Sequence, residues 1–422
     1  MKKYSMLVIF VILIMTGCTR HTEPKSVEPV RDNKLEIWSY YDGWQEEAND
    51  FKAKYGEDIE VEVKVFSNKE YVDAYLEGMA SGDGPDLVIM DSLQMGQFNT
   101  LDAFENLLDE PYNIGRYKKD FDKSGWTAGM DFKQEKMIAV MVASAPKVTF
   151  YRADIMKEHG FPDDPMELAT FLEDPNNYLA VAESLKKDGI YVAQWALDPL
   201  TILMSAMPYF DQDYNFVMTN EAFSKGIELC RIFKEKGLLS YKDVWLEEGQ
   251  ELIKKNQHAM LYFGTWGSSQ IESWVPEQKG LWRVTSLPFG THAVSNGTLM
   301  AIPSNSNNKE LAWEFIEQYV FGDLMPIVAG SIPCYVPKQA AFCEASGENE
   351  FLGGQNEQQF YTDILKKCKH IRMSSLDEDA LRIINEQIIK GIDSNYSNES
   401  IIQNIDKEIE KQLSEKKEIL KK

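Results

Sequence analysis

Three short strands are predicted in the first part of the chain, between residues 35 and 91. Residues 35–39 (Leu-Glu-Ile-Trp-Ser) are the first strand, and residues 59–65 alternate apolar and charged side chains, which is typical of a half-buried strand. Residues 86–90 (Asp-Leu-Val-Ile-Met) show no such alternation. A strand of this kind is expected to be buried on both faces of its sheet.

Two amphipathic helices are predicted between these strands. Residues 44–55 place apolar side chains on one helical face and stop at Gly56, and residues 71–80 show the same spacing. The order strand-helix-strand-helix-strand predicts a parallel sheet covered by helices, that is, an α/β fold.

The rest of the chain continues this mixture of helices and strands. Residues 148–255 are mainly helical in pattern, and the clearest helix follows the capping residue Asn220 and ends at Gly237. Further elements are predicted as strands at 259–263, 282–287 and 299–302, and as helices at 309–320, 377–392 and 399–420.

Aromatic and polar residues gather at one predicted edge of the sheet. Ligands of open α/β sheets bind beyond the carboxyl ends of the strands. The residues that follow the three strands are Tyr40, Tyr41, Asp42 and Trp44, then Ser67 and Asn68, then Asp91 and Ser92. This edge is therefore the first candidate for a binding site.

Length and charge narrow the class of protein. The chain has 422 residues, which is too long for one apolar core and suits two lobes. Its formal net charge of −23 repels phosphate backbones and anionic lipid headgroups. Nucleic acid is therefore not an expected partner, and the main effect of the charge is solubility.

The N-terminus predicts export. Lys2 and Lys3 precede an apolar run at residues 6–15, which is too short for a membrane span of about 20 residues. The sequence Met-Thr-Gly-Cys that ends at Cys18 resembles the lipobox of bacterial lipoproteins, in which the cysteine is lipidated and becomes the mature N-terminus. The alternative is a plain signal peptide with an incidental Cys18. Residues 19–34, polar and without apolar periodicity, are predicted to be a flexible tether.

Signatures of catalysis and of metal binding are scarce. The five histidines are scattered, and the sequence has no His-Glu-x-x-His, no Gly-x-Ser-x-Gly and no phosphate-binding glycine loop. Residues 211–215 (Asp-Gln-Asp-Tyr-Asn) imitate the start of a calcium loop, but Phe216 stands where that loop needs glycine, so a turn is predicted. No catalytic residue, metal or cofactor is therefore predicted.

Four cysteines remain if Cys18 is lipidated. None of them shows the spacing of a metal site, and an oxidising exterior permits disulfides. Cys334 and Cys343 are the one pair close enough for a local bridge, and the sequence leaves open whether it forms.

Aromatic residues are the positive chemical signal, because sugar rings stack on indole and phenol faces while their hydroxyl groups need polar partners. For most tryptophans a position in the core is the simpler interpretation. Trp266 is the exception, since it lies in the turn Gly264-Thr265-Trp266-Gly267 directly after a predicted strand. The candidates are Trp44, Trp195, Trp245, Trp266, Trp274 and Trp282, with Tyr41, Tyr151 and Tyr335.

Four segments, in order and spacing, resemble one known family. They are residues 259–266 (Ala-Met-Leu-Tyr-Phe-Gly-Thr-Trp), 282–288 (Trp-Arg-Val-Thr-Ser-Leu-Pro), 297–303 (Gly-Thr-Leu-Met-Ala-Ile-Pro) and 309–316 (Lys-Glu-Leu-Ala-Trp-Glu-Phe-Ile). Together with residues 82–91, 150–154 and 210–215 they resemble the extracellular solute-binding proteins of family 1, the maltose-binding-protein-like receptors of ABC sugar importers. The resemblance covers nearly the whole mature chain.

The resemblance implies a fold and its division. The fold is α/β and like that of type II periplasmic binding proteins, with two α/β lobes, a hinge and a ligand cleft between the lobes. The expected division is a signal peptide at 1–17, the lipidated cysteine and tether at 18–34, an N-terminal lobe at 35–146 plus 290–328, and a C-terminal lobe at 147–289 plus 329–422.

The resemblance also implies a site. Trp266 takes the place of a sugar-stacking tryptophan, Asp91 that of a hydrogen-bonding aspartate, Tyr151 that of a cleft tyrosine and Asn296 that of a ligand-facing turn. Weaker placements in the same site are Tyr41, Trp44, Trp195 and Tyr335.

A non-enzymatic, monomeric receptor is therefore expected on the extracytoplasmic face of a Gram-positive membrane. Its partners are a carbohydrate ligand, the transmembrane subunits of an ABC permease and, through the lipid anchor, the membrane. Two alternatives stay open at this point. One is a polyamine- or cation-binding receptor, and the other is a surface lipoprotein that hydrolyses glycans.

Overall fold

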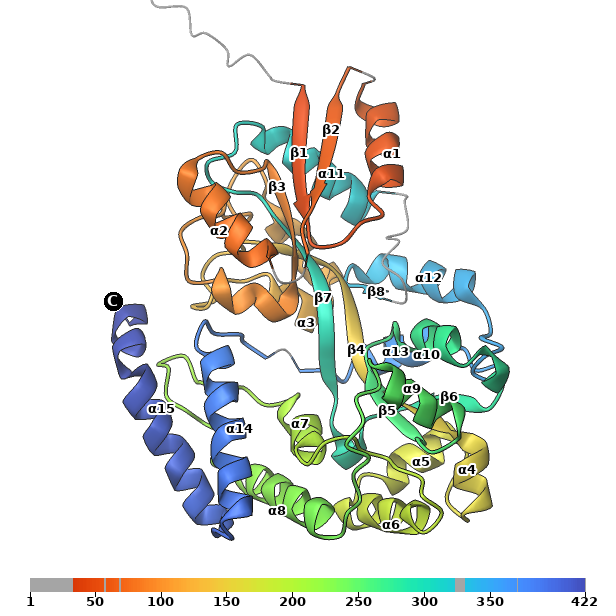
Figure 1. The fold of residues 1–422 in the computed structure, drawn as a ribbon. Coiled ribbons are helices and arrows are strands. Elements are labelled where there is room, and N and C mark those ends of the chain that lie inside the picture. Colours follow the sequence, from red (N-terminus) through yellow and green to blue (C-terminus); the bar gives the residue numbers. More distant parts are fainter. Residues whose placement is uncertain (1–32, 57, 68–69, 323–330, 370, 422) are drawn as a thin grey trace, which may run out of the picture. The chain divides into compact units, whose positions relative to one another are not determined.

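The computed structural model describes residues 33–56, 58–67, 70–322, 331–369 and 371–421 (Figure 1). The predicted signal peptide, Cys18 and nearly all of the predicted tether lie outside the described residues. Within the described part of the chain, none of the helices combines the length and the apolar character that a bilayer span requires.

The strands of the described residues form one mixed sheet in the order β2-β1-β3-β7-β4-β5, with β6 and β8 also paired to β4. The predicted parallel arrangement of the first three strands is confirmed, because β1 pairs in parallel with both β2 and β3. β7 enters this sheet antiparallel to β3 and β4, which the sequence did not predict. The strands are β1 (Lys34–Ser39), β2 (Glu60–Val65), β3 (Leu87–Asp91), β4 (Val140–Arg152), β5 (Met260–Phe263), β6 (Trp282–Thr285), β7 (Ala293–Ala301) and β8 (Ile332–Pro333).

The predicted helices are confirmed within a few residues of their ends. Asn220 caps α8 as expected, since its side chain accepts a hydrogen bond from the amide of Phe223 at 2.9 Å. The helices are α1 (Gln45–Tyr55), α2 (Tyr71–Ser81), α3 (Lys123–Ala128), α4 (Ala153–Glu158), α5 (Pro165–Phe171), α6 (Pro175–Lys186), α7 (Asp198–Met204), α8 (Glu221–Glu235), α9 (Glu247–Lys254), α10 (Gly267–Trp274), α11 (Lys309–Phe321), α12 (Gln339–Ser346), α13 (Glu357–Leu365), α14 (Asp377–Asp393) and α15 (Asn398–Leu420).

β4 and β7 run between two groups of elements (Figure 1). The first group holds β1–β3 with α1, α2 and α11, and the second holds α4–α10 with β5 and β6. Different apolar cores fill the two groups, and the change occurs along β4, where Val142 belongs to the core of the first group and Val148 to a core of the second. The predicted lobe boundaries stay a prediction.

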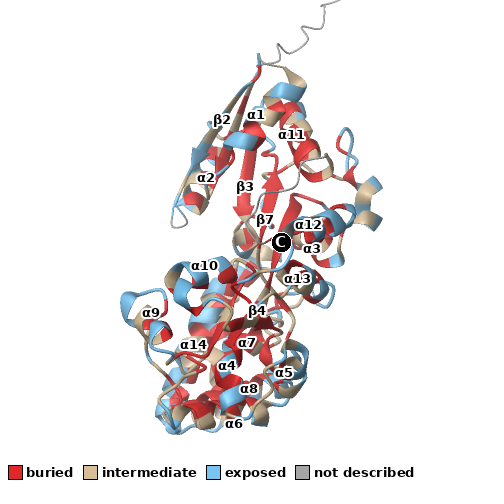
Figure 2. Cartoon of the chain, turned by 90° about the vertical axis from the view of Figure 1, so that its right-hand side faces the viewer, coloured by how far each residue is buried: buried red, intermediate tan, exposed pale blue. Residues whose placement is uncertain are grey.

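The central strands are buried, and several of the surrounding helices expose one face to solvent. β3 is buried except at Asp91, as its sequence predicted, while α9 turns exposed residues outward (Figure 2). α14 and α15 pack against each other and α8 through a continuous apolar stripe. The buried stripe on α15 consists of Ile401, Ile405, Ile409 and Leu413, with Ile402 partly buried against the same core.

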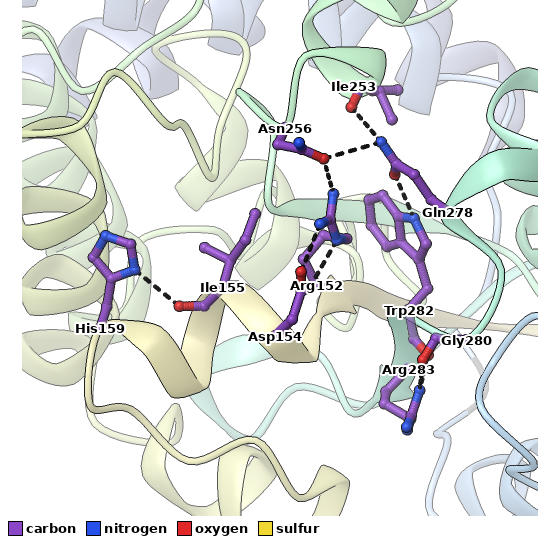
Figure 3. A network of polar contacts seen from close by, with 10 residues as sticks. All are labelled: Arg152, Asp154, Ile155, His159, Ile253, Asn256, Gln278, Gly280, Trp282 and Arg283. Atoms are coloured by element: carbon purple, nitrogen blue, oxygen red, sulfur yellow. Dashed lines mark hydrogen bonds and ion pairs between the residues drawn. The ribbon is translucent and has the colours of Figure 1, made fainter.

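A polar network ties β4 to β6 and to the loops beside them (Figure 3). The guanidinium of Arg152, at the end of β4, donates to Asp154 at 2.7 and 2.8 Å and to Asn256. Gln278 donates to Asn256 at 3.2 Å and accepts the indole N–H of Trp282 at 2.9 Å. The network satisfies a charged side chain that is almost completely buried.

The structure answers two questions that the sequence left open, a disulfide bridge and a calcium-like loop. All four cysteines of the described chain are free, so Cys334 and Cys343 form no bridge. The segment 211–215 is a turn as predicted, because the carboxylate of Asp211 accepts the amides of Asp213 and Asn215, both at 2.9 Å.

Gly297 of β7 lies opposite Ser144 of the paired strand β4 and has no room for a side chain. A Cβ there would lie 2.0 Å from the Cε of Met141 and 2.7 Å from the carbonyl oxygen of Ala143. We expect Gly297→Val to lower the free energy of unfolding by about 1–3 kcal/mol, because the backbone of β4 must move. Urea denaturation measures the loss. Gly115→Ala is the control, since its nearest neighbour would be 3.9 Å away, and equal effects of both changes would contradict the account.

Candidate binding site

A cavity of about 380 Å³ lies between the two groups of elements. One wall comes from the segment after β3 and from α3, the opposite wall from α7, residues 369–373 (of which 370 is not described) and α14, and the floor from β4 and β7. Sites for small molecules measure about 300–1,000 Å³, so this volume suits a small ligand.

Asp91 shapes the wall next to β3. Its carboxylate accepts the backbone N–H of Leu93 at 2.9 Å and starts the short 3₁₀ helix Ser92–Gln97, so that Ser92 and Leu93 line the cavity. Burial raises the pKa of Asp91, and hydrogen bonds from Leu93 and from the side chain of Asn296 oppose that rise. Two predicted site residues, Asp91 and Asn296, are therefore in contact beside the cavity.

Lys147 is a basic residue in the floor of the cavity. It is the single charged residue of β4 before Arg152, and it lines the cavity. Burial lowers the pKa of Lys147, and the nearby carboxylate of Asp198 acts in the opposite direction. Asp198 begins α7 and accepts the backbone N–H groups of Gln194 and Trp195 at 2.7 and 3.0 Å. Its carboxylate is therefore held by the backbone.

Four aromatic residues form a group, here called the aromatic surface: the exposed Trp195, Tyr241 and Trp245 and the half-buried Trp266. Trp195 is 44%, Tyr241 49% and Trp245 50% exposed, which is unusual for such large side chains. Trp195 and Tyr241 lie 6.4 Å apart between ring centres, and Trp245 and Trp266 5.7 Å. Gln194 joins the two pairs, because its carbonyl accepts the amide of Tyr241 and its side chain that of Val244, both at 3.0 Å.

The aromatic surface reaches the cavity at Gly264. A Cβ on Gly264 would lie 2.5 Å from the indole nitrogen of Trp266 and 3.2 Å from the Cβ of Ser295. Ser295 belongs to β7 and lines the cavity. Trp266 also stacks on Phe263 at 5.2 Å, so β5 fixes the plane of its ring.

The other predicted site residues lie in apolar or aromatic clusters. Trp44 is buried and donates its indole N–H to Ser39 at 3.0 Å, with Tyr41 packed on its ring at 5.3 Å. Tyr151 is fully buried and donates its hydroxyl to the carbonyl of Asp163 at 2.7 Å.

Tyr335 packs against the rings of Phe121 and Phe321, at 5.8 and 5.1 Å. None of the eight predicted side chains lines the cavity itself. Trp266, Asp91 and Asn296 neighbour residues of its lining. Trp195 belongs to the aromatic surface, and Trp44 and Tyr151 form structural hydrogen bonds.

The sequence did not predict several residues that line the cavity. A lysine alone in a long apolar strand is a signal that could have identified Lys147. Arg372, Met204 and Asn99 carry no comparable signal, because they come from separate segments that only the fold brings together.

Comparison with known proteins identifies the class. Residues 46–323 match the family described as bacterial extracellular solute-binding protein, and the chain belongs to this family. The resemblance that the sequence suggested and the fold class that it implied are thereby confirmed. A search of curated proteins found no significant match.

Solved structures of low sequence identity share the fold. An extracellular solute-binding protein of family 1 has a TM-score of 0.78 at 16% identity, over 90% of this chain and 99% of that one. The galacto-N-biose-/lacto-N-biose I-binding protein of the ABC transporter from Bifidobacterium longum has a TM-score of 0.69 at 16% identity, over 90% and 97%. The sugar-binding protein MalE from Xanthomonas citri has a TM-score of 0.70 at 16% identity, over 92% and 99%.

Proposed function

We propose that this chain is the receptor of an ABC importer, which captures a carbohydrate in the cavity and delivers it to the permease. The observation that carries the proposal is the origin of the cavity walls. One comes from the segment after β3, whose Met95 belongs to the core of the first group, and the other includes α7 of the second group. A ligand in the cavity would therefore contact both lobes at once.

Contact with both lobes gives the ligand a way to drive closure. A ligand shifts a conformational equilibrium only through its higher affinity for one state, and hinge closure around a ligand is a common form of that shift. Reversal from 1:99 to 99:1 needs about 5.5 kcal/mol of differential affinity. The closed form would be the one that docks on the transmembrane subunits.

Carbohydrate is the ligand class that the aromatic surface supports best. Exposed indole and phenol rings offer faces for the C–H side of a sugar, and the serines and threonine of the cavity wall offer hydrogen bonds to hydroxyl groups. Solved structures of the same fold are described as complexes with lacto-N-biose and with beta-1,6-galactobiose.

The other parts of the proposal come from the sequence. Lipidation of Cys18 would hold the monomeric receptor beside its permease, and residues 19–34 would set the distance over which it searches. The cavity does not favour the two alternatives. A polyamine receptor and a glycan hydrolase both need carboxylates around the ligand, and none of the described residues that line the cavity is Asp or Glu.

Removal of one indole tests the stacking role. We expect Trp266→Ala to weaken the best-binding saccharide about tenfold or more, because truncation of an aromatic anchor costs about 2 kcal/mol. Isothermal titration calorimetry with a saccharide panel measures the change. Tyr396→Ala is the matched control, as this exposed tyrosine lies between α14 and α15 and should leave binding unchanged. Unchanged affinity in Trp266→Ala would refute this site assignment.

A further inference from the structure

The charge of the cavity is opposite to that of the protein. The chain carries a formal net charge of −23. The charged residues that line the cavity are Lys147, Lys369 and Arg372, and no acidic residue stands among the described lining. In so acidic a chain, a wall with three cations and no carboxylate indicates selection for a negatively charged occupant.

The three cations lack close carboxylate partners in the ranges that the structure describes, although Asp198 is near enough to act on Lys147. Within the described part of the chain, none of the three forms an ion pair. The guanidinium of Arg372 lies over the ring of Phe132 at 5.3 Å, and its Nε is buried without a hydrogen-bond partner among the described residues. A buried donor without a partner costs free energy, and a ligand oxygen would remove that cost.

Three carboxylates near the cavity accept hydrogen bonds from backbone N–H groups. Asp91 accepts that of Leu93 at 2.9 Å. Asp198 accepts two backbone N–H groups at the start of α7, and Asp377 accepts the amide of Ser374 at 3.0 Å at the start of α14. Burial raises the pKa of Asp198 and raises the pKa of Asp377 to about 7, so the fold does not favour their charged forms. Asp198 still acts on Lys147 and offsets part of its charge, but it does not form an ion pair with it.

The same wall also contains a hydrogen-bond acceptor that a ligand hydroxyl group could satisfy. The side-chain amide of Asn99 donates to the carbonyl of Met373 at 2.7 Å, and its Oδ1 is buried without a donor among the described residues. Ser92, Thr201 and Ser295 add hydroxyl groups to the lining. A free inorganic anion would not fill a cavity of about 380 Å³. An unpartnered acceptor next to cations suits a molecule that carries both hydroxyl and anionic groups.

We propose that the cavity binds an acidic saccharide, a sugar of one or two rings that bears a carboxylate. The carboxylate is held by Arg372 and Lys147, and a ring hydroxyl donates to Asn99. The proposal rests on the function proposed above and names its ligand class. Six methionines of the described lining supply adaptable apolar contacts for the C–H faces of the rings.

Calorimetry with a matched pair of disaccharides tests the proposal. The probes are digalacturonate and its methyl ester, which differ in charge and share the ring geometry, together with inorganic phosphate. We expect the full-length protein to bind digalacturonate about tenfold or more tightly than the ester, since hydrogen bonds between charged groups are the stronger ones. The preference should shrink as salt is raised.

Substitutions locate the charge. Arg372→Gln and Lys147→Met should each lose about tenfold or more in affinity for digalacturonate and little for the ester, and Arg372→Lys should retain part of the preference. Lys390→Gln, an exposed lysine near the end of α14, is the control and should bind like the wild type. Thermal melting of each variant checks that it is folded.

The outcomes distinguish a failure of the acidic ligand from a failure of the proposed carbohydrate receptor. Equal or tighter binding of the ester overturns the acidic ligand and leaves a carbohydrate receptor. Phosphate that binds as tightly as digalacturonate overturns the saccharide in favour of a free anion. Failure of both disaccharides and of every neutral sugar overturns the acidic ligand and the proposed function together.

Discussion

Replacement of Arg152 by methionine is expected to lower the free energy of unfolding by about 3 kcal/mol, because hydrogen bonds to a charged group contribute about 1.5–3 kcal/mol each. The side chain of Arg152 is only 3% exposed, and its three donated bonds hold Asp154 and Asn256 in place. Methionine keeps much of the volume and removes all three. The side-chain oxygen of Asn256 then keeps only the 3.2 Å bond from Gln278, which is also the partner of the Trp282 indole.

Urea denaturation followed by circular dichroism measures this effect. Arg382→Met is the matched control, because its guanidinium is about half exposed on α14 and pairs with Asp379 and Glu386. Exposed ion pairs contribute about 0–1 kcal/mol, so this variant should differ little from the wild type. If both arginine variants lost the same stability, the network of Figure 3 would not have the role assigned to it.

Acidification is expected to destabilise the protein through His258, by about 3 kcal/mol between pH 6.5 and pH 4. The ring is buried, its Nδ1 donates to the carbonyl of Met260 at 3.1 Å, and its Nε2 has no partner among the described residues. Burial lowers the pKa of His258 to about 4, from an unfolded value near 6.5. The unfolded chain therefore takes up a proton first, and stability that is complete above pH 6.5 falls until pH 4.

The comparison of wild type with His258→Gln isolates this contribution from other titrating groups. Asp377 works in the opposite direction, because its pKa is raised to about 7 and its neutral form is favoured in the fold. Both proteins contain Asp377, so its contribution cancels when the stability curve of one protein is subtracted from that of the other. We expect the stability of His258→Gln to fall less between pH 6.5 and pH 4. Parallel stability curves for the two proteins would contradict a buried neutral histidine.

Local sequence patterns predicted most of the helices and the first three strands, but they missed β4, whose last residues were assigned to a mainly helical region. They predicted the pairing of the strands less well. The alternation at residues 59–65 and the continuous apolar run of β3 are properties of neighbouring residues, so the sequence contains them. The antiparallel entry of β7 joins residues about 200 positions apart in the chain. No local pattern carries that information.

The candidate site, too, is predicted only in part by local sequence, because the rest depends on residues that are distant in the chain. Trp44 and Trp266 are both tryptophans directly after a strand, yet Trp44 fills a core and Trp266 borders the cavity. Composition and spacing do not separate the two cases, because the difference depends on which distant residues pack against each ring. The charge of the cavity was hidden for the same reason, since Lys147 and Arg372 are 225 positions apart.

The proposed function requires one ligand that occupies the cavity and contacts both lobes. Hydrogen exchange followed by mass spectrometry, with and without saturating saccharide, measures whether both walls are covered. We expect slower exchange on both walls, in residues 92–99 on one side and residues 201–209 and 371–373 on the other. Slower exchange confined to one wall, or found only in segments away from the cavity, would contradict it.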